Sequence, residues 1–479
     1  MTNTAKTQAI AQHDNDMTGD GAANTANFPP YLREAGEALR RGELDQAERA
    51  VRAVLEQRPD DPAANFVFGA VLLRRDSPEE AITALETVLR ANESNLRALS
   101  LMSRALRMAG REDDAVNAAK KALTAQPRSA EAATDLAEAL SASGDSAGAL
   151  AAFRRAVSLG PELARAHLGL AHALILNGEF GAGWREYEWR YKIPGTRERM
   201  PKIQRPEWSG MKLSPDERLL LIGDQGFGDT FQFARYVKLA AERCSNIALG
   251  ASKETQKLLA RIPGVKACSS RMEELAPVAT WATLSSLPYI FGTELDSIPD
   301  ETPYLTVDKA KVTAWKKRLA EIADGKTTVG IAWAGRPSNS LERKRATTFD
   351  ALSALSGPRV KLVSLQIGPA AEQRLAHAKG GEVFDAAPEL ADFDDTAALI
   401  CALDCVVTIE TAVAHLTGAL GRPGFVLLPH VADWRWGEKR ADSPWYPSLK
   451  LFRQPKPGAW EAAIASAAKA LSTLNKNKR

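Results

Sequence analysis

The chain has few cysteines and almost no surplus of either charge, and both features narrow what it can be. Four cysteines in 479 residues are too few for a disulfide scaffold. The only close pair, Cys401 and Cys405, lies in the apolar run LICALDCVVTI, so we interpret both as reduced core residues. Lysine plus arginine (62) nearly balances aspartate plus glutamate (59). This balance gives no electrostatic argument for binding nucleic acid or a membrane surface.

The N-terminal segment, residues 1–27, lacks an apolar core. It is rich in Ala, Thr, Asn and Asp, which is typical of neither a signal peptide nor a membrane anchor. We therefore expect a disordered leader, no membrane insertion and a cytoplasmic location.

A period of 34 residues runs through the next part of the chain. Three kinds of residue keep this spacing: small residues where two helices would cross, turn residues between the helices, and a proline at the end of most repeats. The pattern resembles the tetratricopeptide repeat and covers about residues 28–194. The small residues are Ala47, Ala81, Ala115, Ala149 and Gly183, the turn residues are Gly42, Asp76, Gly110, Gly144 and Gly178, and the closing residues are Pro59, Pro127 and Pro161, with Glu93 in the remaining place.

Such repeats form an α-solenoid whose groove normally takes an extended peptide or a partner protein. The phase of the repeat places six side chains on the predicted groove, although solvated or packing roles would also explain them. They are Leu73, Arg74, Arg104, Arg107, Leu168 and His172. Trp184, Tyr187 and Tyr191 then share one helical face, which we interpret as packing at the end of the solenoid.

After residue 215, short apolar runs alternate with helical stretches, which predicts βαβ units and parallel sheets. RLLLIG and NIALGA belong to a first series, and TTVGIAWAG, CVVTIE and GFVLLPH belong to a second. Two series predict two doubly wound lobes, residues 205–325 and 326–479, with a cleft between the carboxyl ends of their strands. The alanine-rich stretch 458–474 predicts a C-terminal helix.

The loop QGFGD follows the first apolar run. A glycine loop that opens a helix commonly holds phosphate, because unpaired N–H groups and the helix dipole favour an anion. This loop has Phe231 where a dinucleotide fingerprint needs a third glycine, and it has no Gly-Lys-Ser/Thr. Asp229 would also put a negative charge where the phosphate would lie. The motif therefore predicts a role other than phosphate binding.

The segment CVVTIETAVAHLTGALG carries a better anion site. A buried strand ends at Glu410, a helix starts at Thr411, and His415 lies one turn further on. Small residues such as Ala412 would let a phosphate or pyrophosphate reach the first N–H groups. A capped helix with a satisfied histidine remains the alternative.

A cationic loop, GRPSNSLERKRATT, follows the strand VGIAWAG. It contains Arg336, Arg343, Lys344 and Arg345, and arginine is suited to bidentate contact with phosphate. The loop is either one side of an anion clamp or a solvated surface loop.

Six further segments together resemble bacterial proteins that fuse tetratricopeptide repeats to a glycosyltransferase domain akin to the heptosyltransferases. With the repeats, the resemblance covers nearly everything from residue 28 onward. It implies a two-lobed glycosyltransferase fold of the GT-B type, with a nucleotide sugar on the C-terminal lobe and the acceptor on the N-terminal lobe. The segments are QGFGDTFQFARY (225–236), WAG (333–335), DTAAL (395–399), HLTGALG (415–421), DWRW (433–436) and SPWYPSLKLFRQ (443–454).

The resemblance implies roles for individual residues. Asp229 matches the proposed catalytic base, which would take the proton of the acceptor hydroxyl in an inverting transfer, although a plain N-cap with Gln232 completing a capping box is the alternative. The acceptor loop is Gln225, Gly226 and Gly228. The donor-binding residues are Trp333, Arg336, Arg343, Arg345, Gln366, Glu410, Thr411, Ala412, His415 and Arg435.

The chain departs from the family pattern at two of these positions. Glu410 stands where the family usually has Asp, and Arg336 stands where it often has Asn. The identity of the sugar is therefore open. We expect no metal and no other cofactor, because no His/Cys cluster has ligand spacing and Asp392 and Asp394 are better explained by helix capping. The aromatic residues Trp434, Trp436, Trp445 and Tyr446 either flank the nucleotide or pack.

The sequence as a whole predicts a glycosyltransferase whose solenoid captures a protein acceptor and presents its Ser or Thr hydroxyl. Some relatives with this architecture modify flagellin, so flagellin is a plausible partner. Two alternatives remain. One is a non-catalytic scaffold with a degenerate transferase fold, and the other is a transferase that acts on lipopolysaccharide or another glycan.

Overall fold

The computed structural model describes residues 29–335, 344–375 and 383–474. The chain forms two compact units, of which the first ends at Arg199 and the second begins at Met200. The predicted leader and two of the predicted cations, Arg336 and Arg343, lie outside the described residues.

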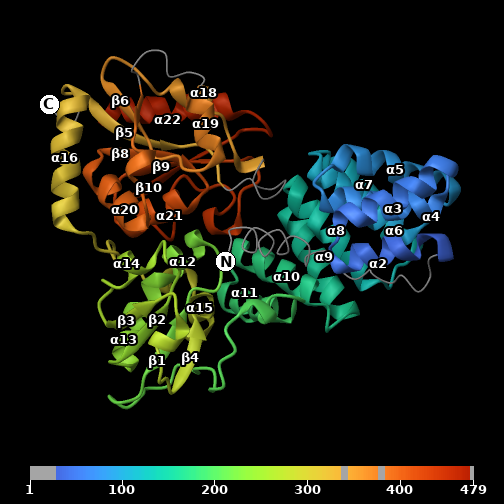
Figure 1. Cartoon of the computed structure of the whole chain (residues 1–479), viewed down its shortest axis with the longest axis horizontal. Helices are drawn as coiled ribbons and strands as arrows, with labels where there is room; N and C mark the ends of the chain where they lie inside the picture. The colour runs from blue at the N-terminus through green and yellow to red at the C-terminus, as the bar shows by residue number, and fades with distance from the viewer. Residues whose placement is uncertain (1–28, 336–343, 376–382, 475–479) are drawn as a thin grey trace. The chain divides into compact units, whose positions relative to one another are not determined.

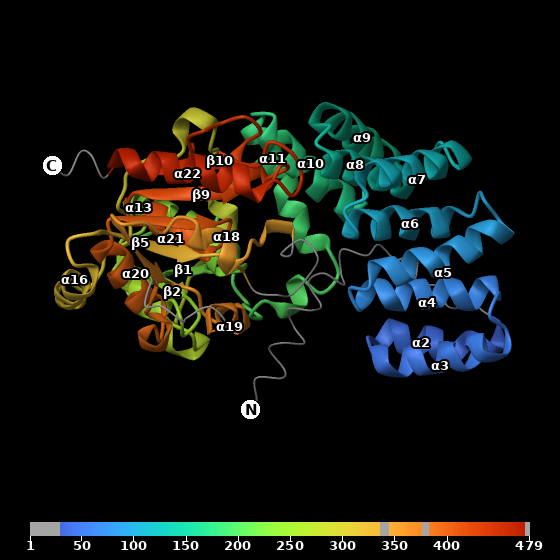
Figure 2. The same cartoon turned by 90° about the horizontal axis from the view of Figure 1, so that it is seen from above.

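The first unit is a stack of helix pairs (Figures 1 and 2). The two helices of each pair pack together, the second helix packs on the next pair, and the first helices of successive pairs also contact one another. The predicted repeat array is therefore confirmed. The elements are η3 (Pro30–Leu32), α2 (Arg33–Arg41), α3 (Leu44–Gln57), α4 (Pro62–Arg74), α5 (Pro78–Ala91), α6 (Leu96–Met108), α7 (Glu112–Ala125), α8 (Ala130–Ser143), α9 (Ser146–Leu159), α10 (Ala164–Leu176), α11 (Phe180–Tyr187), η4 (Glu188–Lys192) and η5 (Arg197–Arg199).

Two local constraints explain the 34-residue period. The turn between the helices of each pair needs a left-handed residue, and all five turn residues have positive φ, from 60° at Asp76 to 88° at Gly178. The crossing point needs a small side chain. Ala47, Ala81 and Ala115 are fully buried there, and a Cβ on Gly183 would lie 2.5 Å from Cγ1 of Ile175.

The aromatic residues at the end of this unit pack within it. Trp184 and Tyr187 are buried, with their ring centroids 5.8 Å apart. Trp189, which we did not single out from the sequence, stacks on His167 at a centroid distance of 3.7 Å. The packing role predicted for Trp184 and Tyr187 is confirmed.

The second unit contains two parallel sheets, as predicted. Within the described part of the chain, one has four strands in the order β3-β2-β1-β4, and the other has six in the order β10-β9-β8-β5-β6-β7. Counted from its own first strand, each sheet begins with the order 3-2-1-4, and the larger one completes the doubly wound order 3-2-1-4-5-6. The strands are β1 (Leu219–Ile222), β2 (Ile247–Gly250), β3 (Val265–Ser269), β4 (Thr280–Thr283), β5 (Thr327–Ala332), β6 (Val360–Ser364), β7 (Val383–Asp385), β8 (Cys405–Ile409), β9 (Gly424–Leu428) and β10 (Leu449–Arg453).

The helices of the second unit cover these sheets. On the six-stranded sheet, α22 contacts β9, β10 and α18. Helix α16 contacts β5 and α20, and α21 contacts α20, β8 and β9. The predicted C-terminal helix is confirmed as α22. The helices are α12 (Phe227–Phe233), η6 (Ala234–Tyr236), α13 (Val237–Arg243), α14 (Gln256–Leu259), η7 (Met272–Glu274), η8 (Leu284–Ser286), α15 (Leu287–Ile290), η9 (Leu295–Ser297), α16 (Lys309–Ala323), α18 (Phe349–Ser353), η10 (Pro369–Ala371), α19 (Glu372–Leu375), η11 (Ala387–Glu389), α20 (Phe393–Ala402), α21 (Ala412–Ala419), η12 (Trp434–Trp436) and α22 (Trp460–Leu474).

The strand order determines where a ligand site would form. In a doubly wound sheet, ligands bind at the carboxyl ends of the two neighbouring strands whose connections leave in opposite directions. These strands are β1 and β4 in the smaller sheet and β5 and β8 in the larger one. The loop before α12 follows β1, and α21 follows β8, so both sequence motifs lie at such positions.

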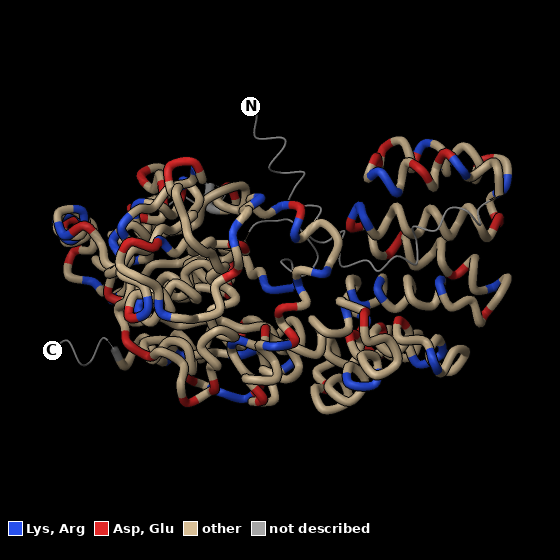
Figure 3. Tube along the Cα trace, turned by 90° about the horizontal axis from the view of Figure 1, so that it is seen from below, with Lys and Arg blue, Asp and Glu red and all other residues tan. Residues whose placement is uncertain are grey.

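Along the residues that the structure describes, charges of both signs are interspersed in both units, and neither sign gathers into one long run (Figure 3). Among the described residues, no helix combines the length and the apolar character that crossing a bilayer requires.

Candidate functional site

Asp229 lies in the first turn of α12, just beyond the carboxyl end of β1. Its Oδ2 accepts a hydrogen bond from the backbone N–H of Gly226 at 3.1 Å. Gly226 is the N-cap residue of the helix, so the predicted alternative, in which Asp229 is the N-cap and Gln232 completes the capping box, is wrong. Asp229 caps the helix from its third position and keeps its second oxygen for another partner.

That partner is Arg435, which belongs to η12 beside the six-stranded sheet. Nη2 of Arg435 donates to Oδ1 of Asp229, and Nε donates to Oε1 of Gln232 at 2.7 Å. Nη1 donates to Oδ1 of Asp433, also at 2.7 Å. The guanidinium therefore joins α12 of one sheet to η12 of the other. The sequence indicated both Asp229 and Arg435, but nothing in it pairs two residues 206 positions apart.

His415 lies on α21 at the same junction. The N-cap residue Thr411 accepts a hydrogen bond from the N–H of Val413 at 3.3 Å, which confirms the predicted helix start. Nδ1 of His415 is 2.9 Å from the hydroxyl of Tyr446. A Cβ on Gly228 would lie 2.8 Å from Cδ2 of His415, so glycine is required where α12 meets α21.

The histidine ring is held neutral by its surroundings. Burial, reinforced by the positive charge of Arg435, lowers the pKa of His415 to about 3. The imidazole therefore carries no charge at neutral pH and can act there only through hydrogen bonds.

Glu410, Arg345 and Asp433 extend the charged cluster. Arg345 lies 3.5 Å from Oε1 of Glu410 through Nη1 and 3.7 Å from Oδ2 of Asp433 through Nη2. Burial raises the pKa of the Glu410 carboxyl, while the Arg345 charge acts in the opposite direction. Oε2 of Glu410 has no hydrogen-bond partner among the described residues. The sequence segment DWRW contained Asp433, but we assigned it no role, although it contacts both arginines.

Two residues predicted to bind the donor are structural instead. Trp333 is fully buried in the core of the six-stranded sheet, with its ring 5.2 Å from that of Phe349. Oε1 of Gln366 accepts the N–H groups of Trp333 and Ala334, both at 3.0 Å, and its amide donates to two backbone carbonyls. Because Gln366 uses its whole amide to join the ends of β5 and β6, a ligand contact by this side chain is contradicted.

The remaining predicted residues lie at the two strand ends. Gly226 precedes α12, and Gln225 and Ala412 are half-buried beside the first turns of α12 and α21. Asp224, which we missed, accepts a hydrogen bond from the hydroxyl of Ser285 at 2.5 Å and so ties the loop after β1 to η8 after β4. A polar residue directly after an apolar strand was the available signal.

The C-terminal aromatic residues mostly pack. Trp436, Trp445 and Tyr446 are essentially fully buried, and the ring of Trp436 is 5.3 Å from that of His415. Trp434 lies under the Arg435 guanidinium at 4.2 Å. Of the two predicted roles, packing explains the three buried rings.

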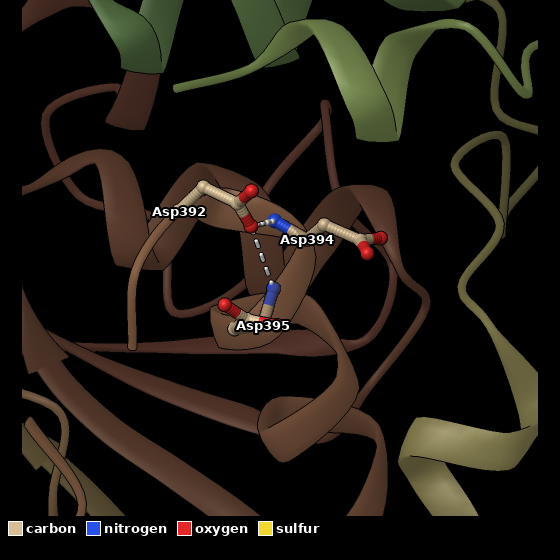
Figure 4. A group of neighbouring side chains, drawn as sticks. All are labelled: Asp392, Asp394 and Asp395. Carbon is tan, nitrogen blue, oxygen red and sulfur yellow. Dashed lines mark hydrogen bonds between the residues drawn. The ribbon is translucent and has the colours of Figure 1, made fainter. Parts of the chain in front are cut away.

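Three carboxylates at the start of α20 are close enough to hold a metal ion, Asp392, Asp394 and Asp395 (Figure 4). Cations of the protein already contact all three. Lys257 pairs with Asp392 at 2.8 Å, Arg261 pairs with Asp394, and Lys311 reaches both Asp394 and Asp395 at 2.7 and 2.6 Å. Asp392 also caps α20 through the N–H groups of Asp394 and Asp395, as predicted. This chemistry suits a structural ion-pair cluster better than a metal site.

Three of the six residues predicted for the solenoid groove make contacts within the repeat unit. Leu73 is buried in the repeat core, so a groove contact is contradicted. Arg74 donates to the carbonyl of Leu39, and Arg107 pairs with Glu138 at 2.6 Å, so both link the first helices of neighbouring pairs.

Arg104, Leu168 and His172 are half-buried on those helices. Arg165, which we missed, pairs with Asp135 and with Glu138, the latter at 2.8 Å.

A match to a protein-family model supports the repeat assignment. The model of the family described as "Tetratricopeptide repeat" matches residues 32–95, 69–130, 100–162 and 134–183. Among curated proteins, the chain is similar to Protein FlbA of Caulobacter vibrioides (strain ATCC 19089 / CIP 103742 / CB 15), with 30% identity over 319 residues. The match covers 61% of this chain and 52% of the relative, so the chain spans about half of that protein's length.

Solved structures with partial similarity include MamA, with 19% identity, 35% of this chain and 97% of that chain covered and a TM-score of 0.30. A thermophilic TPR protein of Thermus thermophilus, TTC0263, has 19% identity, coverage of 34% and 89% and a TM-score of 0.31. The family model matches the same helix pairs that carry the 34-residue period. The helix pairs of the first unit are tetratricopeptide repeats.

Proposed function

We propose that the chain is a glycosyltransferase that moves a sugar from a nucleotide sugar to a Ser or Thr hydroxyl of a protein. The observation that carries the proposal is the meeting of Asp229, Arg435 and His415, which come from the two sheets. A carboxylate that can take a proton thus lies beside cations that can bind phosphate. Two parallel sheets with the same initial strand order are also what a GT-B fold requires.

The proposed reaction assigns a role to the carboxylate and to the cations. The acceptor oxygen attacks the anomeric carbon of the sugar, its proton passes to Asp229, and the bond from that carbon to the phosphate oxygen breaks with inversion. The leaving nucleotide carries the negative charge that develops. Arg345, Arg435 and the N–H groups at the start of α21 would stabilise this charge, which is commonly a large contribution to catalysis.

The repeats supply the argument for a protein acceptor, because tetratricopeptide solenoids present extended surfaces to partner proteins. A small sugar acceptor would not need such a surface. Flagellin is our candidate acceptor within this proposal, and the nucleotide sugar remains to be identified.

The direct test is transfer by the purified full chain, with intact-mass measurement of proteins from cells with and without the gene to identify acceptor and sugar. Replacing Asp229 by Asn should lower kcat/KM about 100- to 10,000-fold, the usual contribution of a positioned base. Asp216→Asn, at an exposed turn before β1, is the matched control and should retain full activity. If the Asp229→Asn protein folds correctly and keeps full turnover, Asp229 is not the base and the proposed mechanism is wrong.

A non-catalytic scaffold is the second candidate, and one observation favours it. Both oxygens of Asp229 are engaged, one by Arg435 and one by the N–H of Gly226, as expected of a purely structural carboxylate. Binding of candidate nucleotide sugars separates the two functions, because a scaffold that has lost the donor site would bind none of them.

A further inference from the structure

Arg435 has an unusual set of partners for a residue that would bind a ligand. Its Nε, Nη1 and Nη2 each contact a side-chain oxygen, on Gln232, Asp433 and Asp229 respectively. The side chain is only 12% exposed. In this arrangement an oxygen of Asp229 occupies the position on Nη2 that an oxygen of an anionic ligand would take.

The two carboxylates differ in how easily they could be exchanged. Asp433 is two residues from Arg435 in the chain, and its Oδ1 also accepts the backbone N–H of Arg435 at 3.1 Å. Asp433 is therefore held to Arg435 by both a backbone and a side-chain hydrogen bond within one short segment. Asp229 reaches Arg435 from α12, on the other sheet, and it has a second anchor at Gly226 that does not depend on Arg435. Asp229 is therefore the partner that can leave.

A second cation lies within the same cluster. Arg345 contacts Oδ2 of Asp433 and Oε1 of Glu410 at 3.7 and 3.5 Å, which is longer than the roughly 2.7–2.9 Å of a strong charge-assisted bond. Asp433 thus has one guanidinium on each of its oxygens. Three carboxyl groups surround these two guanidinium groups, namely Asp229, Asp433 and Glu410. Arg345 and Arg435 both contact Asp433, so a single anion could contact both guanidinium groups.

We propose that an anion of the diphosphate class displaces Asp229 from Arg435, with Arg345 as its second contact, and that Asp229 becomes available to accept a proton only when this anion is bound. The proposal rests on the function proposed above and deepens it. It makes the Arg435–Asp229 pair a resting state of an enzyme, and it requires the nucleotide sugar to bind before the acceptor hydroxyl is activated.

The proposal predicts that removing the Asp229 carboxylate increases the affinity for the anion. Loss of a contact that only stabilised the fold would not increase this affinity. Inorganic pyrophosphate is the probe, and titration calorimetry with the full chain measures its Kd. If the pair is closed in about nine molecules of ten, Asp229→Asn should bind pyrophosphate about tenfold more tightly, because the apparent Kd is the intrinsic Kd divided by the competent fraction. Asp229→Glu keeps the charge and should stay near the native Kd.

Two further variants complete the test. Arg435→Gln should weaken pyrophosphate binding by at least about tenfold, since it removes the shared cation. Asp216→Asn should leave the Kd unchanged, and circular dichroism verifies the fold of each protein. Tighter binding by Asp229→Asn, with loss in Arg435→Gln, supports the proposal.

Equal or weaker binding by Asp229→Asn overturns it, and so does failure of both the native chain and Asp229→Asn to bind pyrophosphate. The function proposed above fails separately. If transfer is never observed while Asp229→Asn still binds more tightly, the exchange stands and the glycosyltransferase assignment does not.

Discussion

Acidification should destabilise the second unit through His415. The ring is buried at the junction of α12 and α21, and its pKa is lowered to about 3 from the ordinary value of 6.5. Between these two pH values, the ring is protonated in the unfolded chain but stays neutral in the folded chain. Proton binding therefore stabilises the unfolded state, and the free energy of unfolding falls as the pH falls from 6.5 towards 3. Going from pH 7 to pH 5 should cost about 2 kcal/mol.

Two measurements check this expectation. In a histidine-labelled sample, the ring signal that disappears in His415→Gln should keep its neutral chemical shift down to pH 5. In urea unfolding, the difference in stability between the native chain and His415→Gln should shift by about 2 kcal/mol in favour of the variant between pH 7 and pH 5. Comparing the two proteins cancels the contributions of other titrating groups. A midpoint above pH 5 for this signal, or equal losses of stability in both proteins, would refute the reasoning.

Two further predictions concern packing and buried charge. Gly228→Ala should destabilise the second unit by about 1–3 kcal/mol, because the added Cβ would lie 2.8 Å from His415, whereas Gly357→Ala meets no atom within 4 Å and should change the melting temperature little. Arg165→Met removes the cation that pairs with the buried Asp135 in the repeat unit and should cost about 3–5 kcal/mol in urea unfolding. Arg154→Met removes an exposed ion pair and should cost less than about 1 kcal/mol, and equal losses for the two arginines would show that burial is not the cause.

The repeats were predictable because their constraints are local. A left-handed turn and a narrow crossing each demand a particular residue at one position, and Gly110 and Ala115 satisfy them at a fixed spacing. The parallel sheets were predictable for a similar reason, since buried strands read as short apolar runs. The position of a residue within the repeat did not by itself show whether its side chain faces the groove or the core. Leu73 was assigned to the groove but is buried, because neighbouring positions on one helix point in directions that differ only by a rotation about the helix axis.

Several residues of the candidate site were indicated by the sequence one by one, but their arrangement was not. Asp229 and Arg435 were both indicated, yet their pairing depends on how two sheets pack and leaves no local signal. The same reason explains the missed role of Asp433, whose two arginine partners lie on different segments. Gln366 was assigned to the ligand through the resemblance, and the sequence does not show that two backbone N–H groups at a strand end require its side chain as an acceptor.

The ion pair between Asp229 and Arg435 crosses from one sheet of the second unit to the other. Its partners are carried by separate sheets, so a motion that moves the sheets apart must break the pair. A spectroscopic ruler that spans the two sheets would then report whether the pair is closed, and, under the proposed function, an engineered tether that held the sheets at this spacing would keep Asp229 paired and slow transfer.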